Sequence, residues 1–260
     1  MKYTVLLVLS CLAVTAFSQP GKKTATLPPT TVETHKTVYN MALKTGETNV
    51  ALISLYYIVA EEGSKSAYKD SMAILYFNMG SYTQCEIVAA EIVKDNADTV
   101  AKGGKLPVLE VLALSQSALG KTKEAIASFE KLLPLTNEMF HAYRLAELQF
   151  LYKRYGESVE SIKKAENLKN SLSSPITIDM GNNQAQQVQL EAAVMNLKGF
   201  IWMELYPNEL DKAIGYFSKA LEIQPNFVLA KNNLEFAVKK KNPEPAVSPD
   251  DKNKPVEPKK

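Results

Sequence analysis

Histidine, cysteine and acidic residues are the side chains of this sequence that could perform catalysis or hold a metal. His35 and His141 are the only histidines and lie far apart, and Cys11 and Cys85 are the only cysteines. Nucleophilic catalysis by serine or cysteine needs a histidine within hydrogen-bond reach, and zinc sites need several ligands at characteristic spacing. The sequence has neither pattern, so we expect no enzyme, no cofactor and no metal. An enzyme would require an acid–base pair assembled from distant segments.

Two local features look chemical but have structural interpretations. Gly120-Lys121-Thr122 matches the end of a phosphate-binding loop. The upstream glycine that such a loop needs is Ser115 here, and helical patterns flank the segment on both sides, so we interpret it as a turn. Cys85 occupies a position of small core residues, where a buried thiol behaves as a small hydrophobe.

The first eighteen residues have the pattern of a cleaved secretory signal. Lys2 precedes an apolar run over residues 5–17, and Ala16 and Ser18 place small residues at the −3 and −1 positions of a cleavage site. We therefore expect residues 1–18 to be removed and the protein to be periplasmic or secreted. A lipoprotein acylated at Cys11 is the disfavoured alternative. The part after residue 18 has no Asn-x-Ser/Thr site, which favours a bacterial envelope protein.

The charge balance excludes two classes of partner. Removing residues 1–18 takes away Lys2 and changes the formal charge from +2 to +1. Nucleic acids and anionic membrane surfaces both select strongly basic faces. We therefore expect neither a nucleic-acid partner nor a membrane-surface partner, and no later segment is apolar enough for an integral membrane span.

A pattern of small, aromatic and glycine residues recurs along the middle of the chain. Copies occupy residues 72–92, 112–132, 145–165 and 199–226, and a weaker one begins near residue 46. Gly46 and Gly80 are 34 residues apart, as are Ala51 and Cys85. The small residues let neighbouring helices approach each other, and the glycines allow the positive φ that ends a helix.

These residues resemble the tetratricopeptide repeat (TPR) family, whose unit is 34 residues of paired antiparallel helices. The resemblance identifies the chain as an exported bacterial member and covers residues 32–240. It implies an all-α, right-handed α-solenoid of about five TPR-like helical hairpins, closed by a C-terminal capping helix at residues 227–240. Residues 19–31 read as a linker, and the Pro-, Lys- and Glu-rich residues 241–260 as a disordered tail.

Two insertions interrupt the regular spacing. Ala125 follows Cys85 by 40 residues, and Ala213 follows Ser158 by 55. The extra residues fall near residues 96–107 and 170–187. The second insert is long and polar, and loops of this length are either functional or disordered. The sequence leaves both alternatives open.

The resemblance also implies where a partner binds, because the first helix of each TPR unit lines a concave groove that takes extended or helical peptides. Lys36 and Asn40 match the start of a carboxylate clamp, but the later clamp positions are Ser71, Pro107 and Val111, so a chaperone-tail receptor is not expected. The candidate groove residues are Lys36, Asn40, Asp70, Phe77, Asn78, Glu110, Tyr143, Glu147 and Phe150.

The sequence therefore predicts a non-catalytic protein–protein interaction scaffold of the bacterial cell envelope, binding a protein or peptide in this groove. The alternative is an exported helical-repeat protein that captures a small ligand or glycan. That alternative rests on the signal, on aromatic residues such as Tyr143 and Phe150, and on the polar insert. Thermal-shift screening against sugars separates the two, because a ligand stabilises the folded state that binds it. The oligomeric state is left open.

Overall fold

In the computed structural model, residues 31–168, 175–181 and 184–243 are described. The predicted signal (1–18), all but the last residue of the linker (19–31) and residues 244–260 of the predicted tail lie outside the described residues. Within the described ranges, no helix is both long and apolar enough to span a bilayer.

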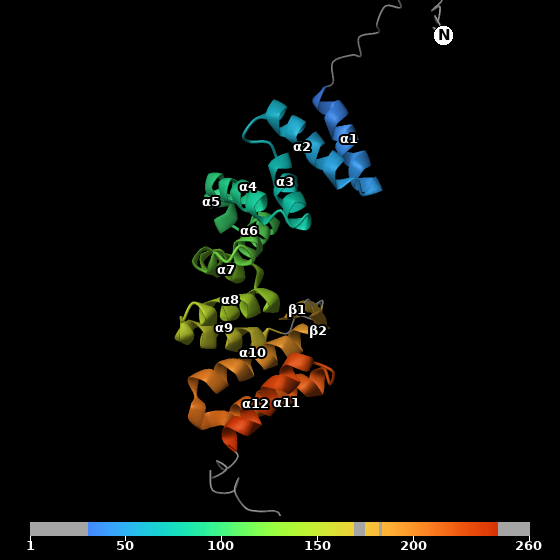
Figure 1. The fold of residues 1–260 in the computed structure, drawn as a ribbon. Coiled ribbons are helices and arrows are strands. Elements are labelled where there is room, and N and C mark those ends of the chain that lie inside the picture. Colours follow the sequence, from blue (N-terminus) through green and yellow to red (C-terminus); the bar gives the residue numbers. More distant parts are fainter. Residues whose placement is uncertain (1–30, 169–174, 182–183, 244–260) are drawn as a thin grey trace, which may run out of the picture.

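The described chain is a stack of paired helices that runs from α1 at one end to α12 at the other (Figure 1). Its five pairs are α1 (Val32–Thr45) with α2 (Thr48–Glu62), α3 (Tyr68–Asn78) with α4 (Tyr82–Asp95), α6 (Leu106–Ala118) with α7 (Thr122–Thr136), α8 (Met139–Leu151) with α9 (Tyr155–Asn167), and α10 (Leu190–Leu205) with α11 (Leu210–Ile223). Helix α12 (Val228–Lys241) closes the stack. The predicted all-α helical-repeat solenoid with a capping helix is confirmed.

The turns inside the pairs repeat one backbone geometry. Gly80 and Gly120 have φ of 70° and 71°, and the next residue donates its N–H back to a carbonyl of the preceding helix. Lys153 occupies the same position between α8 and α9 with φ of 62°, and Arg154 N lies 2.8 Å from Gln149 O. The Schellman hydrogen bond therefore holds this turn without a glycine.

Small residues form the contacts between helices, as the pattern predicts. Ala73, Ala113 and Ala146 on the first helices are fully buried. Gly199 on α10 receives the ring of Phe217 from α11, and a Cβ at this glycine would lie 2.7 Å from Phe217 Cε1. Cys85 is also buried, and burial raises the pKa of its thiol, which makes it a poor nucleophile.

One polar contact recurs inside the pairs. Ser128 Oγ donates to Gln116 Oε1 at 2.7 Å between α7 and α6, and Ser161 Oγ donates to Gln149 Oε1 at the same distance between α9 and α8. These four side chains are largely buried, so each hydrogen bond satisfies polar groups that have little access to water.

A lysine is buried between the last two pairs. Lys198 on α10 is 6% exposed. Its ammonium bonds Glu166 of α9 and lies 4.3 Å from the ring centroid of Tyr216 on α11. The same position of the earlier first helices holds Met72, Leu112 and Leu145, so an ion pair replaces an apolar contact here.

The two insertions become short elements of their own. The first contains α5 (Ala97–Ala101). The second contains a β-hairpin of β1 (Ile176–Gly181) and β2 (Gln184–Val188), which adds a small sheet to the expected all-α fold. A one-turn 3₁₀ helix, η1 (Pro207–Glu209), separates α10 from α11.

The β-hairpin is antiparallel and projects beside α8 and α10 (Figure 1). Its register pairs Ile176 with Val188 and Ile178 with Gln186, and it shifts between Asp179 and Gly181. Ile176 and Ile178 alternate with polar residues and pack against the main hydrophobic core, while Val188 is fully buried. This period of two is the pattern of a half-buried strand.

Candidate functional site

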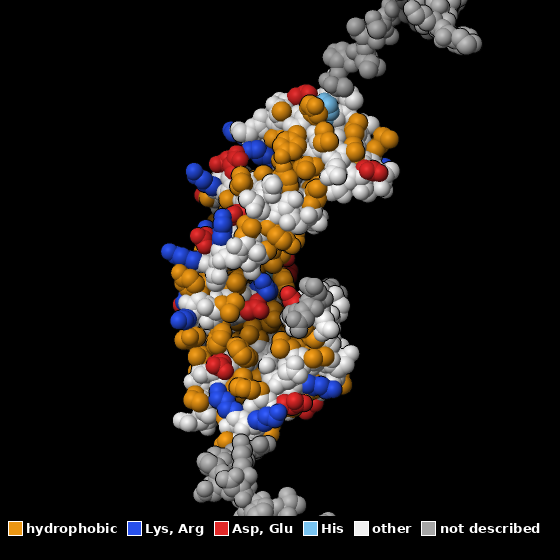
Figure 2. Space-filling model, in the orientation of Figure 1, with side chains coloured by type: hydrophobic (Ala, Val, Ile, Leu, Met, Phe, Trp, Pro, Cys, Tyr) orange, Lys and Arg blue, Asp and Glu red, His pale blue; other side chains and the backbone are white. Residues whose placement is uncertain are grey.

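A cavity of about 570 Å³ lies on the hairpin side of the stack. Three elements form it: α6, α8 and β1. Figure 2 shows the molecule hollowed beside the hairpin, with hydrophobic side chains gathered in the hollow. The lining residues are Leu114, Phe140, Tyr143, Arg144, Glu147 and residues 176–179. The volume falls in the range of known ligand sites.

Helix periodicity explains why α8 supplies so much of the lining. Phe140, Tyr143 and Glu147 are spaced three and four residues apart, so they share one face of the helix. Leu114 lies on the corresponding face of α6. The second insertion then places Ile176 and Ile178 opposite these side chains. The lining therefore combines apolar side chains with polar and charged ones.

The charged side chains of the cavity are fixed by hydrogen bonds. Arg144 donates from Nη1 to Glu147 Oε2 at 2.5 Å and from Nη2 to Ser117 Oγ at 2.7 Å. Asp179 of β1 adds a further carboxylate to the lining. The cavity thus combines apolar and charged side chains, some of them oriented by hydrogen bonds, and carries no excess of positive charge.

Tyr143 is the most buried polar side chain of the cavity. It is 6% exposed, and burial, with a smaller contribution from the Glu147 carboxylate, raises the pKa of its phenol. Within the described ranges, no side chain or backbone group hydrogen-bonds its hydroxyl. Because Tyr143 lines the cavity and its hydroxyl is not sealed from solvent, the hydroxyl is open to water or to a polar group of a ligand.

The raised phenol pKa values predict a loss of stability at alkaline pH. Burial and the hydroxyl of Tyr56 also raise the pKa of Tyr76, to about 12. Unfolded tyrosines titrate near pH ~10, so the stabilisation is complete below that pH and is lost as the pH rises through the folded-state pKa. We expect the free energy of unfolding to fall above pH ~10, less steeply in Tyr143→Phe. Urea unfolding across this range measures it. An identical slope in Tyr143→Phe and the unmodified protein would contradict the assignment to Tyr143.

The structure brings two of the predicted groove residues together and distributes the others along the stack. Tyr143 and Glu147 both line the cavity. Phe150 lies on the same helix, where its ring centroid is 5.4 Å from that of Phe200 on α10. Phe77 is half-buried with its ring centroid 5.7 Å from that of Tyr82, and Asn40 and Asn78 are exposed.

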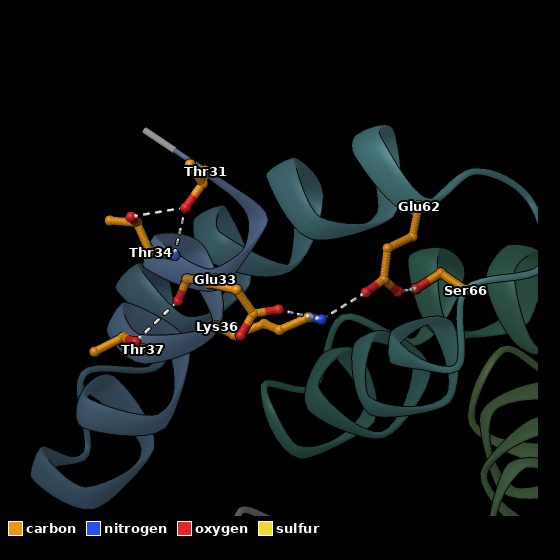
Figure 3. Close-up of polar contacts among 7 residues, drawn as sticks. All are labelled: Thr31, Glu33, Thr34, Lys36, Thr37, Glu62 and Ser66. Atoms are coloured by element: carbon orange, nitrogen blue, oxygen red, sulfur yellow. Dashed lines mark hydrogen bonds and ion pairs between the residues drawn. The ribbon is translucent and has the colours of Figure 1, made fainter. Parts of the chain in front are cut away.

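Lys36 is engaged within the N-terminal pair of helices (Figure 3). Its ammonium lies 2.9 Å from Glu33 and 3.0 Å from Glu62, and Ser66 donates a hydrogen bond to the second oxygen of Glu62. This chain of contacts connects α1, the end of α2 and the loop before α3. The clamp-like Lys36 is therefore held by two carboxylates of its own chain.

The two acidic candidates outside the cavity are also paired. Asp70 Oδ2 lies 2.5 Å from Lys105 Nζ. Glu110 Oε1 lies 3.3 Å from Nε2 of the buried His141, whose Nδ1 is 2.7 Å from Thr136 Oγ1. Both carboxylates link successive units of the stack, which is a structural role.

Sequence reasoning missed four parts of the cavity: Leu114, Phe140, Arg144 and β1. The α8 residues had a usable signal, because they share a helical face with Tyr143. The position of β1 had none, since it depends on how the insert packs. In the described ranges, no three His, Cys, Asp or Glu side chains are placed to hold a metal ion.

Comparison with known proteins shows the fold. No protein-family model matches the chain, and no curated protein matches its sequence. Residues 41 to the end of MamA from Desulfovibrio magneticus RS-1 are 15% identical, with a TM-score of 0.58 over 76% of this chain and 97% of that one.

A second solved structure is YrrB, described as a TPR protein with an unusual peptide-binding site. It is 13% identical, with a TM-score of 0.59 over 79% of this chain and 92% of that one. These likenesses show that the chain has the helical-repeat fold of TPR proteins.

Proposed function

We propose that this protein is a non-catalytic scaffold of the bacterial cell envelope that binds a protein or peptide partner on its concave, hairpin-bearing face. Export rests on the signal-like residues 1–18. The TPR-type fold supports an interaction role, and the similar YrrB is described as having a peptide-binding site. Fold alone does not define function, so the local site carries the argument.

The observation that carries the proposal is the cavity between α6, α8 and β1. Apolar side chains such as Leu114 and Phe140 lie beside the largely buried Tyr143 side chain and the oriented Arg144–Glu147 pair. Apolar surface supplies binding free energy, and a few fixed polar groups supply specificity. A partner side chain buried here would gain both.

Affinity capture with residues 19–260 from a cell-envelope extract, followed by mass spectrometry, tests this function. Leu114→Glu places a charge in the cavity and is expected to remove the partner. Ile87→Glu is the matched control, because Ile87 is 64% exposed on α4 and lies outside the cavity. Circular dichroism must show that both variants remain helical.

The possible results separate the two candidate functions. A partner that binds the unmodified protein and Ile87→Glu but not Leu114→Glu supports the scaffold. A partner that a folded Leu114→Glu variant retains contradicts the site. Repeated empty captures would favour the small-ligand alternative, and a thermal-shift screen of sugars would follow.

A further inference from the structure

Strand β2 of the β-hairpin is hydrogen-bonded to the stack, and Ile176 and Ile178 of β1 pack against its core. Gln186 of β2 donates from Nε2 to Asn226 O at 2.7 Å and accepts from Val228 N at 3.1 Å. Gln224 donates to Gln187 O at 3.1 Å and accepts from Gln189 N at 2.8 Å. These bonds hold β2 and the residue after it against the connection between α11 and α12.

Strand β1 has a different environment. Among the described residues, its only strand neighbour is β2, so its second edge is unpaired by any strand. Residues 176–179 of β1 line the cavity, whereas no residue of β2 does. The edge strand therefore borders the cavity itself. An edge strand presents backbone N–H and C=O groups that can pair with another extended chain.

We propose that the concave site binds its partner as an extended segment that adds to β1 as a third strand. This inference rests on the proposed function and specifies the conformation and side-chain pattern of the partner. Backbone hydrogen bonds to β1 supply affinity for any extended chain, and pockets for alternate side chains supply selectivity.

The cavity walls define that side-chain pattern. In a strand paired with β1, every second side chain points to the same face as Ile176 and Ile178. Ile176 and Ile178 line the cavity together with Leu114, Phe140 and Tyr143, so partner side chains on that face are expected to be aliphatic or aromatic. The intervening side chains point away and are polar. The partner is therefore a segment of alternating apolar and polar residues.

The anchoring of the hairpin lowers the cost of this binding mode. Val188 is fully buried, and Ile176 and Ile178 pack on the main core, so the edge has a defined position before a partner arrives. A strand that is already in place loses less conformational entropy on binding than a loop that must fold around its ligand. The partner alone has to become ordered.

Synthetic peptides test the proposal. The probes are short peptides in which valine or phenylalanine alternates with threonine or lysine, and scrambled peptides of the same composition. Fluorescence anisotropy with residues 19–260 should show at least about tenfold tighter binding of the alternating set, because only that set matches both edge and cavity. Leu114→Glu should abolish this binding, and Ile87→Glu should preserve it.

Backbone N-methylation then distinguishes strand addition from other modes. A paired strand directs alternate N–H groups to its neighbour, so methylation at every second residue should weaken binding about tenfold, with little effect at the residues between. Amide chemical-shift changes should concentrate on residues 176–179. A uniform methylation effect, or a helical bound peptide, overturns the inference.

Failure of this inference is distinguishable from failure of the scaffold function. If scrambled and alternating peptides bind equally, or none binds, addition to β1 is wrong. If the unmodified protein still captures a partner that the Leu114→Glu variant does not bind, the scaffold function is supported even so. If capture also fails, the scaffold function fails with it, and the small-ligand alternative is tested next.

Discussion

Replacing Phe217 with alanine is expected to lower the free energy of unfolding by about 3–5 kcal/mol. The Phe217 side chain is fully buried on α11 and packs against Gly199 of α10, beside Met203, Ala213 and Ala237. Removing the ring leaves a cavity between two helices whose backbones remain in place. Urea unfolding followed by circular dichroism measures the loss.

Gly199 gives this prediction an internal control. In the unmodified protein, Gly199→Ala should be destabilising, because its Cβ would lie 2.7 Å from the Phe217 ring and force it to move. In the Phe217→Ala background the ring is gone, and alanine should stabilise the helix by about 1 kcal/mol relative to glycine. The effect of Gly199→Ala on the free energy of unfolding is therefore expected to change sign when Phe217 is replaced by alanine. The same effect in both backgrounds would contradict the packing.

Neutralising the partner of the buried lysine is expected to have the second large effect. Glu166→Gln leaves the Lys198 ammonium, 6% exposed, without a counter-charge, and should lower the free energy of unfolding by about 3 kcal/mol. The rings of Tyr216, at 4.3 Å, and Trp202, at 5.7 Å, provide only cation–π contacts in compensation. Chemical unfolding at neutral pH measures the change.

Two further variants make the cause of that loss identifiable. Lys198→Met removes the charge together with its need for a partner and restores the apolar residue type of Met72, Leu112 and Leu145, so it should be nearly neutral. Glu160→Gln breaks the exposed pair with Lys163 and should change stability by less than about 1 kcal/mol. If Lys198→Met costs as much as Glu166→Gln, the loss is one of packing.

The fold was largely predictable because its information is local and repeated. The 34-residue spacing from Gly46 to Gly80 and from Ala51 to Cys85 defines helix pairs, and stacked pairs bury the apolar faces that one pair leaves open. The turn at Lys153 shows that backbone hydrogen bonding alone can form the same turn. The hairpin was missed, although Ile176 and Ile178 alternate with polar residues, because one short strand is a weak signal among helices.

The candidate site was only partly predictable. Tyr143 and Glu147 were predicted because the first helix of each TPR-type unit lines the same side of the stack. Asp70 and Glu110 share that assignment, yet they bond Lys105 and His141 of neighbouring units. The position of β1 determines which of the groove residues line a cavity. Strand β1 belongs to the second insertion, which departs from the repeat. No periodicity encodes that position.

The place at which the β-hairpin enters the chain has a consequence for how this protein can evolve. It lies between the fourth and fifth helix pairs, and each pair of such a stack contacts mainly its neighbours. Mutations of the exposed Thr177 and Asp179 change the cavity wall without replacing a side chain of the hydrophobic core, whereas Ile176 and Ile178 pack against that core. Selection can therefore change this part of the cavity wall while residues elsewhere maintain the thermostability of the stack.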